Sequence, residues 1–252
     1  MSVIFFDIGD TLATPRQEPE GSLTLLPLPR VLAVLDALGG TRKGIISNPG
    51  SQQAAVARAL ADAFPGRFTD PALVHWGVKD SRQIFDRAVA GTGAVADDCV
   101  FVGENAAERG FAREAGMRTA AHPVFALAAT ENRPVLRARV ELRDAQDLSS
   151  LTAAMDGTEA VPAEVVSERL VLAMVTARGV EALEGAGFTV DVRGPVEGLV
   201  ASPDPATEKF VSDLLARGEA VFEGEEPTPR TTHVIERADD GRLTVRRLRF
   251  YH

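Results

Sequence analysis

The first half of the chain alternates short apolar runs with segments whose apolar positions repeat at helical spacing. Residues 3–6 are four consecutive apolar residues, and this run ends at a carboxylate, Asp7. Similar runs at 44–46 and 99–102 also end in polar residues. A short apolar run without polar alternation is typical of a strand buried on both faces, as in a parallel sheet that helices cover. The alternation of strands and helices therefore predicts an α/β fold with a parallel sheet.

The segments between these runs supply the predicted helices and the remaining strands. Apolar residues at positions 31, 34, 35 and 38 follow the helical period, and Gly39 and Gly40 end that helix. Pro15, Pro19 and Pro27 predict a loop or a small flap over 13–28. On the same criteria we expect helices at 29–38, 51–64, 81–90 and 105–116, and strands at 73–76 and 118–121.

The second half of the chain predicts a separate domain. Residues 1–155 form the first domain, which a strand at 139–142 and a short helix complete. A linker at 156–162 then leads to a second domain over 156–252. The order of its elements favours a small α+β sandwich, with the ferredoxin-like fold as one candidate. We expect strands at 170–176, 188–192, 198–201, 231–236 and 243–250, a hairpin turn at 239–241, and helices at 179–185 and 206–217.

Composition limits the partners of the chain. Its 252 residues carry a net charge of −9, with 45% apolar and 25% charged residues, which is ordinary for a globular protein. Residues 156–252 contain 11 Lys and Arg against 18 Asp and Glu, a net charge of −7. Because nucleic-acid binding requires a basic surface, we expect no nucleic-acid partner. The single cysteine, Cys99, excludes a disulfide framework within one chain, and we interpret it as a buried apolar residue.

The sequence contains no stretch typical of a targeting or membrane segment. The N-terminus lacks a basic region followed by an apolar stretch, and no apolar run approaches membrane-spanning length. We therefore expect a soluble, cytoplasmic protein without a membrane partner. The oligomeric state stays open, and a homo-oligomer is one of the alternatives.

Polar side chains follow three of the predicted strands at their carboxyl ends, where open α/β sheets bind ligands. An aspartate there can attack phosphorus and form an aspartyl-phosphate, and Mg²⁺ is usually held by carboxylates, phosphate and waters. A serine hydroxyl can donate to a phosphate oxygen, and a lysine supplies a point positive charge. Glu104 and Glu108 are four residues apart and so share one face of a helix. The candidate residues are Asp7, Asp10, Ser47, Asn48, Lys79, Glu104 and Glu108.

Each of these residues also has an ordinary structural interpretation. Ser47 and Asn48 could cap the helix that follows them. Lys79 alone would be a solvated surface lysine. Glu104 and Glu108 alone would be first-turn acids that the helix dipole favours. Only their combination at neighbouring strand ends favours a site.

The combination resembles the haloacid dehalogenase (HAD) superfamily over residues 1–155. The matching segments are 6–12, 45–48, Lys79 with 84–85 behind it, and 101–105 running on to 115–117, and their order and spacing fit the four motifs of the family. The resemblance implies a HAD-like Rossmann-type sheet and a Mg²⁺-dependent phosphomonoesterase, with Asp7 as nucleophile and metal ligand. It implies metal contacts from the Gly9 carbonyl, Glu104 and Glu108, and contacts with a phosphorylated substrate from Ser47, Asn48 and Lys79.

Two departures from the family pattern bear on activity. Phosphatases of the family carry a second Asp two residues after the nucleophile, as general acid and base. Gly9 stands at that position, and the acid comes one residue later as Asp10, which we include as a candidate catalytic residue. Glutamates replace the usual aspartates of the fourth motif. These departures support an alternative, a catalytically weak or inactive HAD-fold protein whose C-terminal domain binds a partner.

The spacing of the motifs leaves no room for a large inserted cap domain. The segment between Thr11 and Ile45 can hold a flap and one helix, and that between Asn48 and Lys79 a helix and a strand. We therefore expect an open site. The C-terminal domain is the remaining candidate for a lid, and an independent or dimerisation domain is the alternative.

Overall fold

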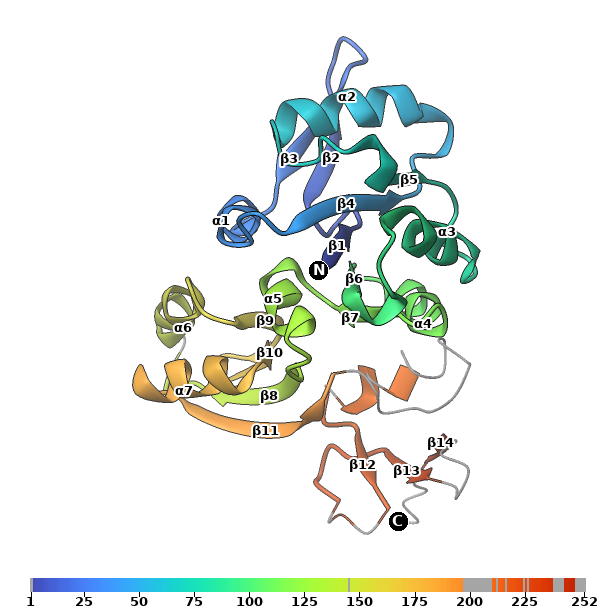
Figure 1. Cartoon of the computed structure of the whole chain (residues 1–252). Helices are drawn as coiled ribbons and strands as arrows, with labels where there is room; N and C mark the ends of the chain where they lie inside the picture. The colour runs from blue at the N-terminus through green and yellow to red at the C-terminus, as the bar shows by residue number, and fades with distance from the viewer. Residues whose placement is uncertain are drawn as a thin grey trace. The chain divides into compact units, whose positions relative to one another are not determined.

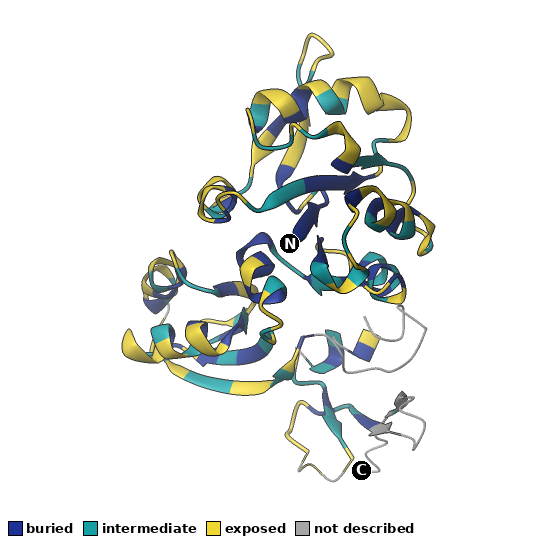
Figure 2. Cartoon of the chain, viewed as in Figure 1, coloured by how far each residue is buried: buried dark blue, intermediate teal, exposed yellow. Residues whose placement is uncertain are grey.

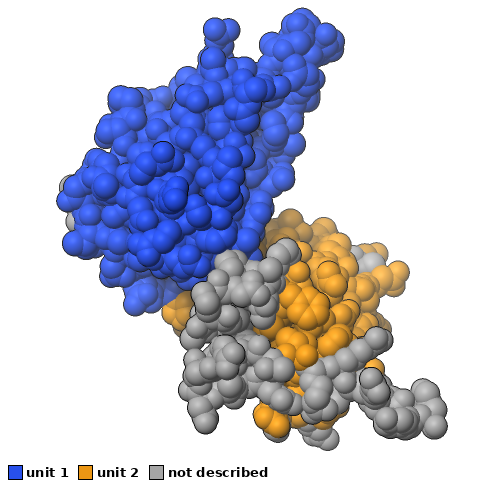
Figure 3. Space-filling view, turned by 90° about the vertical axis from the view of Figure 1, so that its right-hand side faces the viewer, with its two compact units in different colours: residues 1–133 blue, residues 134–252 orange. Residues whose placement is uncertain are grey.

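The computed structural model divides the chain into two compact units, Met1–Arg133 and Pro134–His252, which Figure 3 distinguishes by colour. Each unit is described separately below. None of the described helices is long and apolar enough to cross a membrane. The structure describes residues 2–144, 146–196, 210–211, 213–215, 217–223, 225, 227–237 and 243–247.

The first unit is built on a five-stranded sheet in the order β5-β4-β1-β6-β7, in which all neighbouring strands are parallel. This confirms the predicted parallel sheet flanked by helices (Figure 1). The strands are β1 (Val3–Phe6), β4 (Arg42–Ser47), β5 (Val74–Trp76), β6 (Cys99–Val102) and β7 (Arg118–Ala120). The helices are α1 (Val31–Ala37), α2 (Gln53–Ala63), α3 (Gln83–Thr92), α4 (Ala106–Glu114) and α5 (Ala126–Thr130), with 3-10 turns η1 (Gly50–Gln52), η2 (Pro71–Leu73), η3 (Ala96–Asp98) and η4 (Pro123–Phe125).

Strand β1 is central and has no exposed residue, which explains its uninterrupted apolar sequence (Figure 2). On one face Phe5 belongs to a core cluster with Phe85 of α3 and Phe101 of β6, and the last two rings meet edge to face at 4.9 Å. On the other face Phe6 meets the ring of Phe68 at 6.2 Å. Both faces of the sheet are therefore packed, so an alternating pattern would place polar groups in the core.

Residues 13–28, predicted as a loop or small flap, contain an antiparallel hairpin of β2 (Ala13–Gln17) and β3 (Leu23–Pro27). Its β2 strand has only one buried residue, so the hydrophobic pattern that identifies strands is missing. The end of the hairpin is stabilised by polar contacts instead. Glu18 accepts two hydrogen bonds from Arg16, each of 2.9 Å, and one of 2.8 Å from Thr24.

The second unit begins with the element order βαββαβ around a four-stranded antiparallel sheet, β11-β8-β10-β9. This is the element order of the ferredoxin-like motif. Because β8 pairs with β10 and β11, the division between the units falls after Arg133, whereas the sequence analysis placed it after Met155. The elements are β8 (Leu136–Glu141), α6 (Asp147–Met155), β9 (Ala160–Ser167), β10 (Leu170–Val175), α7 (Ala177–Gly185) and β11 (Thr189–Pro195).

Strand β9 corrects the predicted linker at 156–162, since it already begins at Ala160. Pro162, the last residue of the predicted linker, lies within the strand opposite Ala173 of β10. Strand β9 is an edge strand, and the pairing is irregular beside this position. A proline is tolerated on an edge strand because no further strand needs its missing N–H group.

The last part of the second unit forms a three-stranded sheet in the order β12-β13-β14, with strands β12 (Ala220–Phe222), β13 (His233–Arg237) and β14 (Leu243–Arg247). Its core contains Val211, Leu214, Ala220 and Ile235. Strand β12, which is parallel to β13, was not predicted. The predicted strand at 198–201 and the hairpin turn at 239–241 lie outside the described residues, as does part of the predicted helix at 206–217.

Candidate active site

Asp7 lies directly after β1, at the carboxyl edge of the parallel sheet. Its backbone N–H still donates to the Val102 carbonyl of β6 at 2.9 Å, so the backbone at this residue continues the sheet. The residue is 7% exposed. One carboxylate oxygen, Oδ1, accepts the backbone N–H of Ile8 at 2.8 Å. A buried carboxylate needs partners of this kind to remain charged, and side chains from other elements supply more of them.

Ser47, the last residue of β4, donates its hydroxyl to Oδ1 of Asp7 at 2.8 Å. The alternative that Ser47 caps the next helix is therefore wrong. Asn48 makes a local turn contact instead, since its Oδ1 accepts the N–H of Gly50 at 3.1 Å. Asn48 is exposed, and this hydrogen bond shapes the turn into η1. Ser47 and Asn48, adjacent in sequence, thus take different positions at the sheet edge.

Lys79 is buried between two carboxylates. Its Nζ lies 2.7 Å from Oδ2 of Asp7 and 2.7 Å from Oε2 of Glu108, and its side chain is 3% exposed. The ammonium also lies 5.6 Å from the ring centroid of Phe101, a distance at which the ring face attracts a cation. The interpretation of Lys79 as a solvated surface residue is wrong. The lysine joins strand β1 to helix α4 through two ion pairs.

Glu108 stands in the first turn of α4, and the cap of that helix positions it. The Asn105 side chain accepts the N–H of Ala107 at 2.9 Å and starts the helix at this point. Burial raises the pKa of Glu108 above its ordinary value of 4.5, whereas Lys79 lowers it and the neighbouring carboxylates of Asp7 and Glu104 raise it further. The ion pair with Lys79 thus only partly offsets the cost of removing this carboxylate from water.

Glu104 is linked to the turn after β1 by Thr11. The Thr11 hydroxyl donates to Oε2 of Glu104 at 3.2 Å and accepts the N–H of Glu104 at the same distance. Thr11 is 1% exposed, while Glu104 is exposed. One buried hydroxyl therefore holds the loop after β1 against the loop after β6. The sequence analysis did not assign Thr11 a role; its only signal was a hydroxyl residue in the turn that follows the nucleophile candidate.

Arg109 is a second residue that the sequence did not reveal. It is 6% exposed, and its Nη1 donates to the carbonyls of Gly103 and Glu104, each at 2.7 Å. These bonds satisfy two carbonyls of the loop that carries Glu104, so Arg109 fixes that loop from behind. In the sequence it is an ordinary arginine in an amphipathic helix, and no local pattern distinguishes it.

Asp10 and Gly9 complete the turn after β1. Asp10 is exposed and has a left-handed backbone with φ of 51°, which aspartate tolerates better than most residues. No contact among the described residues joins its side chain to Asp7, Ser47 or Lys79. A Cβ added at Gly9 would meet nothing within 4 Å. The position where the family carries its second acid is therefore sterically open.

The predicted metal ligands do not all converge. Among the described residues no group of three or more His, Cys, Asp or Glu side chains is placed to hold a metal ion. Glu108 is paired with Lys79, and Glu104 with Thr11. A metal held by three or more protein side chains does not fit. Mg²⁺ often binds through only one or two carboxylates, with phosphate and waters.

The first unit is thus an α/β unit with a largely buried serine–carboxylate–lysine–carboxylate cluster at the carboxyl edge of its parallel sheet. Four of the predicted residues, Asp7, Ser47, Lys79 and Glu108, are in direct contact. Glu104 joins them through the turn that Thr11 holds. Asp10 and Asn48 lie at the same edge but are exposed.

Comparisons with known proteins do not assign a family. No family model matches the chain, and no curated protein matches it. Among solved structures, a candidate 3-deoxy-D-manno-octulosonate 8-phosphate phosphatase from Vibrio cholerae is 14% identical with a TM-score of 0.35, over 46% of this chain and 62% of that one.

Two further structures are acyltransferases. The acyltransferase domain of an iterative polyketide synthase of enediyne biosynthesis is 15% identical with a TM-score of 0.21, over 93% of this chain and 48% of that one. An acyl-carrier-protein S-malonyltransferase from Burkholderia pseudomallei is 16% identical with a TM-score of 0.20, over 94% and 89%. Similarities of this size carry no argument about function.

Proposed function

We propose that the first unit is a HAD-type phosphomonoester hydrolase with Asp7 as its nucleophile. The observation that carries this proposal is the position of Lys79, whose ammonium lies 2.7 Å from both Asp7 and Glu108 at the carboxyl edge of the sheet. A buried lysine beside a buried carboxylate, with a serine hydroxyl on the other carboxylate oxygen, supplies a nucleophile, a positive charge and a donor within one small volume. Phosphoryl transfer depends mainly on such positioning and charge neutralisation.

In the proposed reaction a carboxylate oxygen of Asp7 attacks the phosphorus of the ester. The bond between phosphorus and the leaving oxygen breaks, and that oxygen takes a proton from water. Ser47 and Lys79 donate to the phosphoryl oxygens and keep the phosphorus in line with the nucleophile. Water then attacks the aspartyl-phosphate, so that phosphate leaves and the Asp7 carboxylate is restored. Asn48, exposed at the same edge, is our candidate for a contact with the rest of the substrate.

Mg²⁺ belongs to this proposal as the cofactor. Asp7, the Gly9 carbonyl and Glu104 would hold it, because the Thr11 hydrogen bonds keep the loop of Glu104 beside the turn of Gly9. When bound, the ion would neutralise charge on the phosphoryl oxygens. We assign Glu108 to orienting Lys79 rather than to the metal, since these two residues are in direct contact.

Protonation of the leaving oxygen is the step that this site supports least. Asp10 is exposed and has no described contact with the cluster, so we infer that no side chain efficiently protonates the leaving oxygen. A positioned general acid typically accelerates a reaction by ~10²–10⁴-fold. We therefore expect slow turnover of alkyl phosphates and faster turnover of activated aryl phosphates.

A second candidate function is phosphate-ester binding without turnover. The observation that favours it is the number of partners of Asp7: Oδ1 accepts two hydrogen bonds, and Oδ2 is paired with Lys79. A carboxylate stabilised by three such partners is a weaker nucleophile than a carboxylate with fewer. In this alternative the second unit would bind the protein partner.

Turnover on a panel of phosphate esters, with and without Mg²⁺, separates the two functions. We expect activity that requires Mg²⁺ and falls by at least about 10³-fold in Asp7→Asn, with an unchanged circular dichroism spectrum. Wild-type turnover in Asp7→Asn would contradict the nucleophile assignment. Binding of phosphate esters without any turnover would favour the second function.

A further inference from the structure

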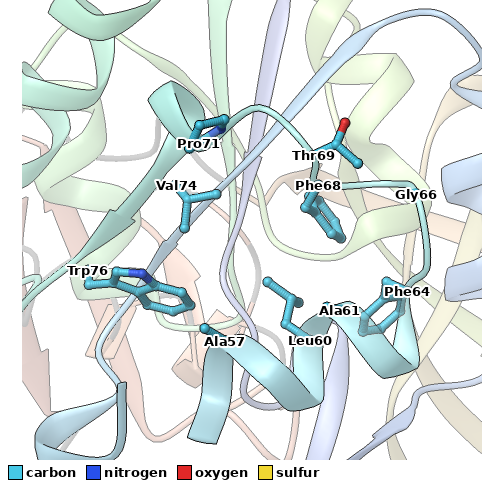
Figure 4. A pocket seen from close by; sticks show the side chains of 10 residues that line it. All are labelled: Ala57, Leu60, Ala61, Phe64, Gly66, Phe68, Thr69, Pro71, Val74 and Trp76. Carbon is cyan, nitrogen blue, oxygen red and sulfur yellow. The ribbon is translucent and has the colours of Figure 1, made fainter. Parts of the chain in front are cut away.

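An apolar groove of about 330 Å³ lies along the edge strand β5, on the side of the sheet that α2 covers (Figure 4). It is lined by α2, by the segment after α2 and by β5, chiefly through Ala57, Leu60, Phe64, Phe68, Val74 and Trp76. Apart from the Thr69 hydroxyl and the indole N–H of Trp76, the lining side chains are apolar. A groove of this size and character is typical of a site for part of a small molecule.

The groove begins one strand away from the candidate active site. Trp76 is paired with Ser47 in the parallel register of β4 and β5, and the next residue, Gly77, donates its N–H to the Ser47 carbonyl at 3.1 Å. Paired residues of parallel strands project from the same face and stand about 4.8 Å apart. The hydroxyl of Ser47 in turn lies 2.8 Å from Asp7. A group attached to a phosphate at Ser47 is therefore within reach of the indole.

At the end near Trp76 the groove is bordered by a small residue, Ala57. Figure 4 shows the Trp76 ring beside Ala57 of α2, with Leu60 farther along the same helix. Trp76 and Ala57 are both half-buried, so part of the indole surface is available to a ligand in the groove. A flat ring that covers this surface would gain the offset or edge-to-face contacts that aromatic pairs prefer.

We propose that this groove binds an aromatic group of the substrate, whose phosphate lies at Ser47 and Lys79. The inference rests on the proposed function for the phosphate end and deepens it by naming an arylalkyl phosphate as the substrate class. It does not depend on catalysis, because an arylalkyl phosphonate has the same two ends and its carbon–phosphorus bond is not hydrolysed.

Trp76 reports on the groove directly, because it is the only tryptophan of the chain. We would titrate the full-length protein with benzylphosphonate and with methylphosphonate and follow tryptophan emission and binding heat. Benzylphosphonate should shift the emission to shorter wavelength, since its ring removes water from the exposed part of the indole. It should also bind about tenfold more tightly, a difference of ~1.4 kcal/mol, and inorganic phosphate should displace both ligands.

A variant whose groove is filled by a larger side chain tests the inference against a control on the same helix. Ala57→Leu adds a larger side chain beside Trp76, so benzylphosphonate should then bind no better than methylphosphonate. Ala55→Leu is the control, because Ala55 lies on the same helix but is exposed and does not line the groove. It should keep the tenfold preference. Circular dichroism and thermal melting of both variants would establish that they fold.

Equal affinity for the two phosphonates, without a change in Trp76 emission, would overturn the inference. The same holds if benzyl alcohol shifts the emission while benzylphosphonate binds no better than methylphosphonate, since the groove would then be separate from the phosphate end. A preference for benzylphosphonate in a protein without turnover would support the groove and remove only the catalytic proposal. Turnover of phosphate esters without any aryl preference would support the catalytic proposal and overturn the proposal for the groove. Failure of both phosphonates to bind would overturn both.

Discussion

The buried charges of the two units have different kinds of partner. In the first unit Asp7 is held by side chains far away in the sequence, Ser47 and Lys79, which follow other strands of the sheet. In the second unit the buried Arg137 donates to the carbonyls of Pro195 and Val196, at 3.0 and 2.8 Å. Asp147, also buried, pairs with Arg143 four residues away.

This difference distinguishes a candidate functional site from contacts that only stabilise the fold. Bonds from a buried charge to backbone carbonyls, as in Arg137, or to a side chain four residues away, as in Asp147, satisfy groups of the fold itself and fix one conformation. A buried lysine shared by two carboxylates from distant elements brings three charged groups together. Removing these groups from water costs free energy, which is typical of a functional site rather than of a structural contact. Arg109 in the first unit also bonds to backbone carbonyls, as Arg137 does, although it stands next to the candidate site.

The largest expected effect comes from restoring an acid in the first unit. Gly9→Asp should raise the turnover of alkyl phosphates by ~10²–10⁴-fold, the usual contribution of a general acid. The position can accept the side chain, because a Cβ there meets nothing within 4 Å. Gly9→Asn, which has the same size but no titrating proton, is the control and should not gain activity. Steady-state kinetics on matched alkyl and aryl phosphates would measure the effect; an equal gain in both variants would mean that protonation is not limiting.

Removing the shared lysine should affect both function and stability. Lys79→Met leaves the buried Asp7 and the partly buried Glu108 without a cation. This is expected to cost about 3–5 kcal/mol of unfolding free energy, and turnover should fall by at least about tenfold. The matched change in the second unit, Arg137→Met, leaves two carbonyls unsatisfied and should cost about 1–3 kcal/mol. Urea denaturation and kinetics on both variants test the comparison, which fails if Arg137→Met lowers the turnover of the folded protein as much as Lys79→Met.

The smallest effects concern pH, and they have opposite signs in the two units. The pKa of Glu108 is raised above 4.5 by burial, so the folded state binds its proton more tightly than the unfolded state. Its contribution to stability therefore falls as the pH rises from 4.5 through the folded pKa. The hydrogen bonds from Arg143 lower the pKa of Asp147 from 3.8 to about 2. The stability that Asp147 contributes is thus present above 3.8 and is lost as the pH falls toward 2.

Denaturation curves of Glu108→Gln and Asp147→Asn between pH 2 and pH 7 (roughly the range over which carboxyl groups titrate) would test this pair. Relative to the wild type, Glu108→Gln should gain stability with rising pH. Asp147→Asn should be the less stable protein near neutrality and approach the wild type in acid. Differences of the same sign in both variants would contradict the assignment.

Much of the first unit could be predicted from the sequence, because strands buried on both faces have an uninterrupted apolar pattern. Residues 3–6 and 99–102 are strands β1 and β6 with the predicted bounds; Asp7 follows the first directly, and Glu104 stands two residues after the second. Ser47 and Lys79 could be predicted only as members of a set, since each alone has an ordinary interpretation. Thr11 and Arg109 could not, because their partners are fixed by loop packing rather than by a local pattern.

The second unit was harder to predict, because its strands have an exposed face and weaker patterns. The predicted linker at 156–162 includes the first three residues of β9. The predicted boundary falls after Met155 because pairing between β8 and β10 is not visible in the local sequence. The role of this unit, as a lid, a partner-binding domain or a dimerisation domain, stays a prediction, as does the oligomeric state.

Pro162 affects how the antiparallel sheet meets other molecules. An edge strand with free N–H and C=O groups is a template on which another chain can add a strand. Strand β9 exposes such an edge and also carries Val165, which is 53% exposed. Pro162 removes one donor from this edge, and the irregular register beside it interrupts the row of groups that an incoming strand would need. Pro162 is thus expected to oppose strand addition, and with it aggregation, at this edge of the folded protein.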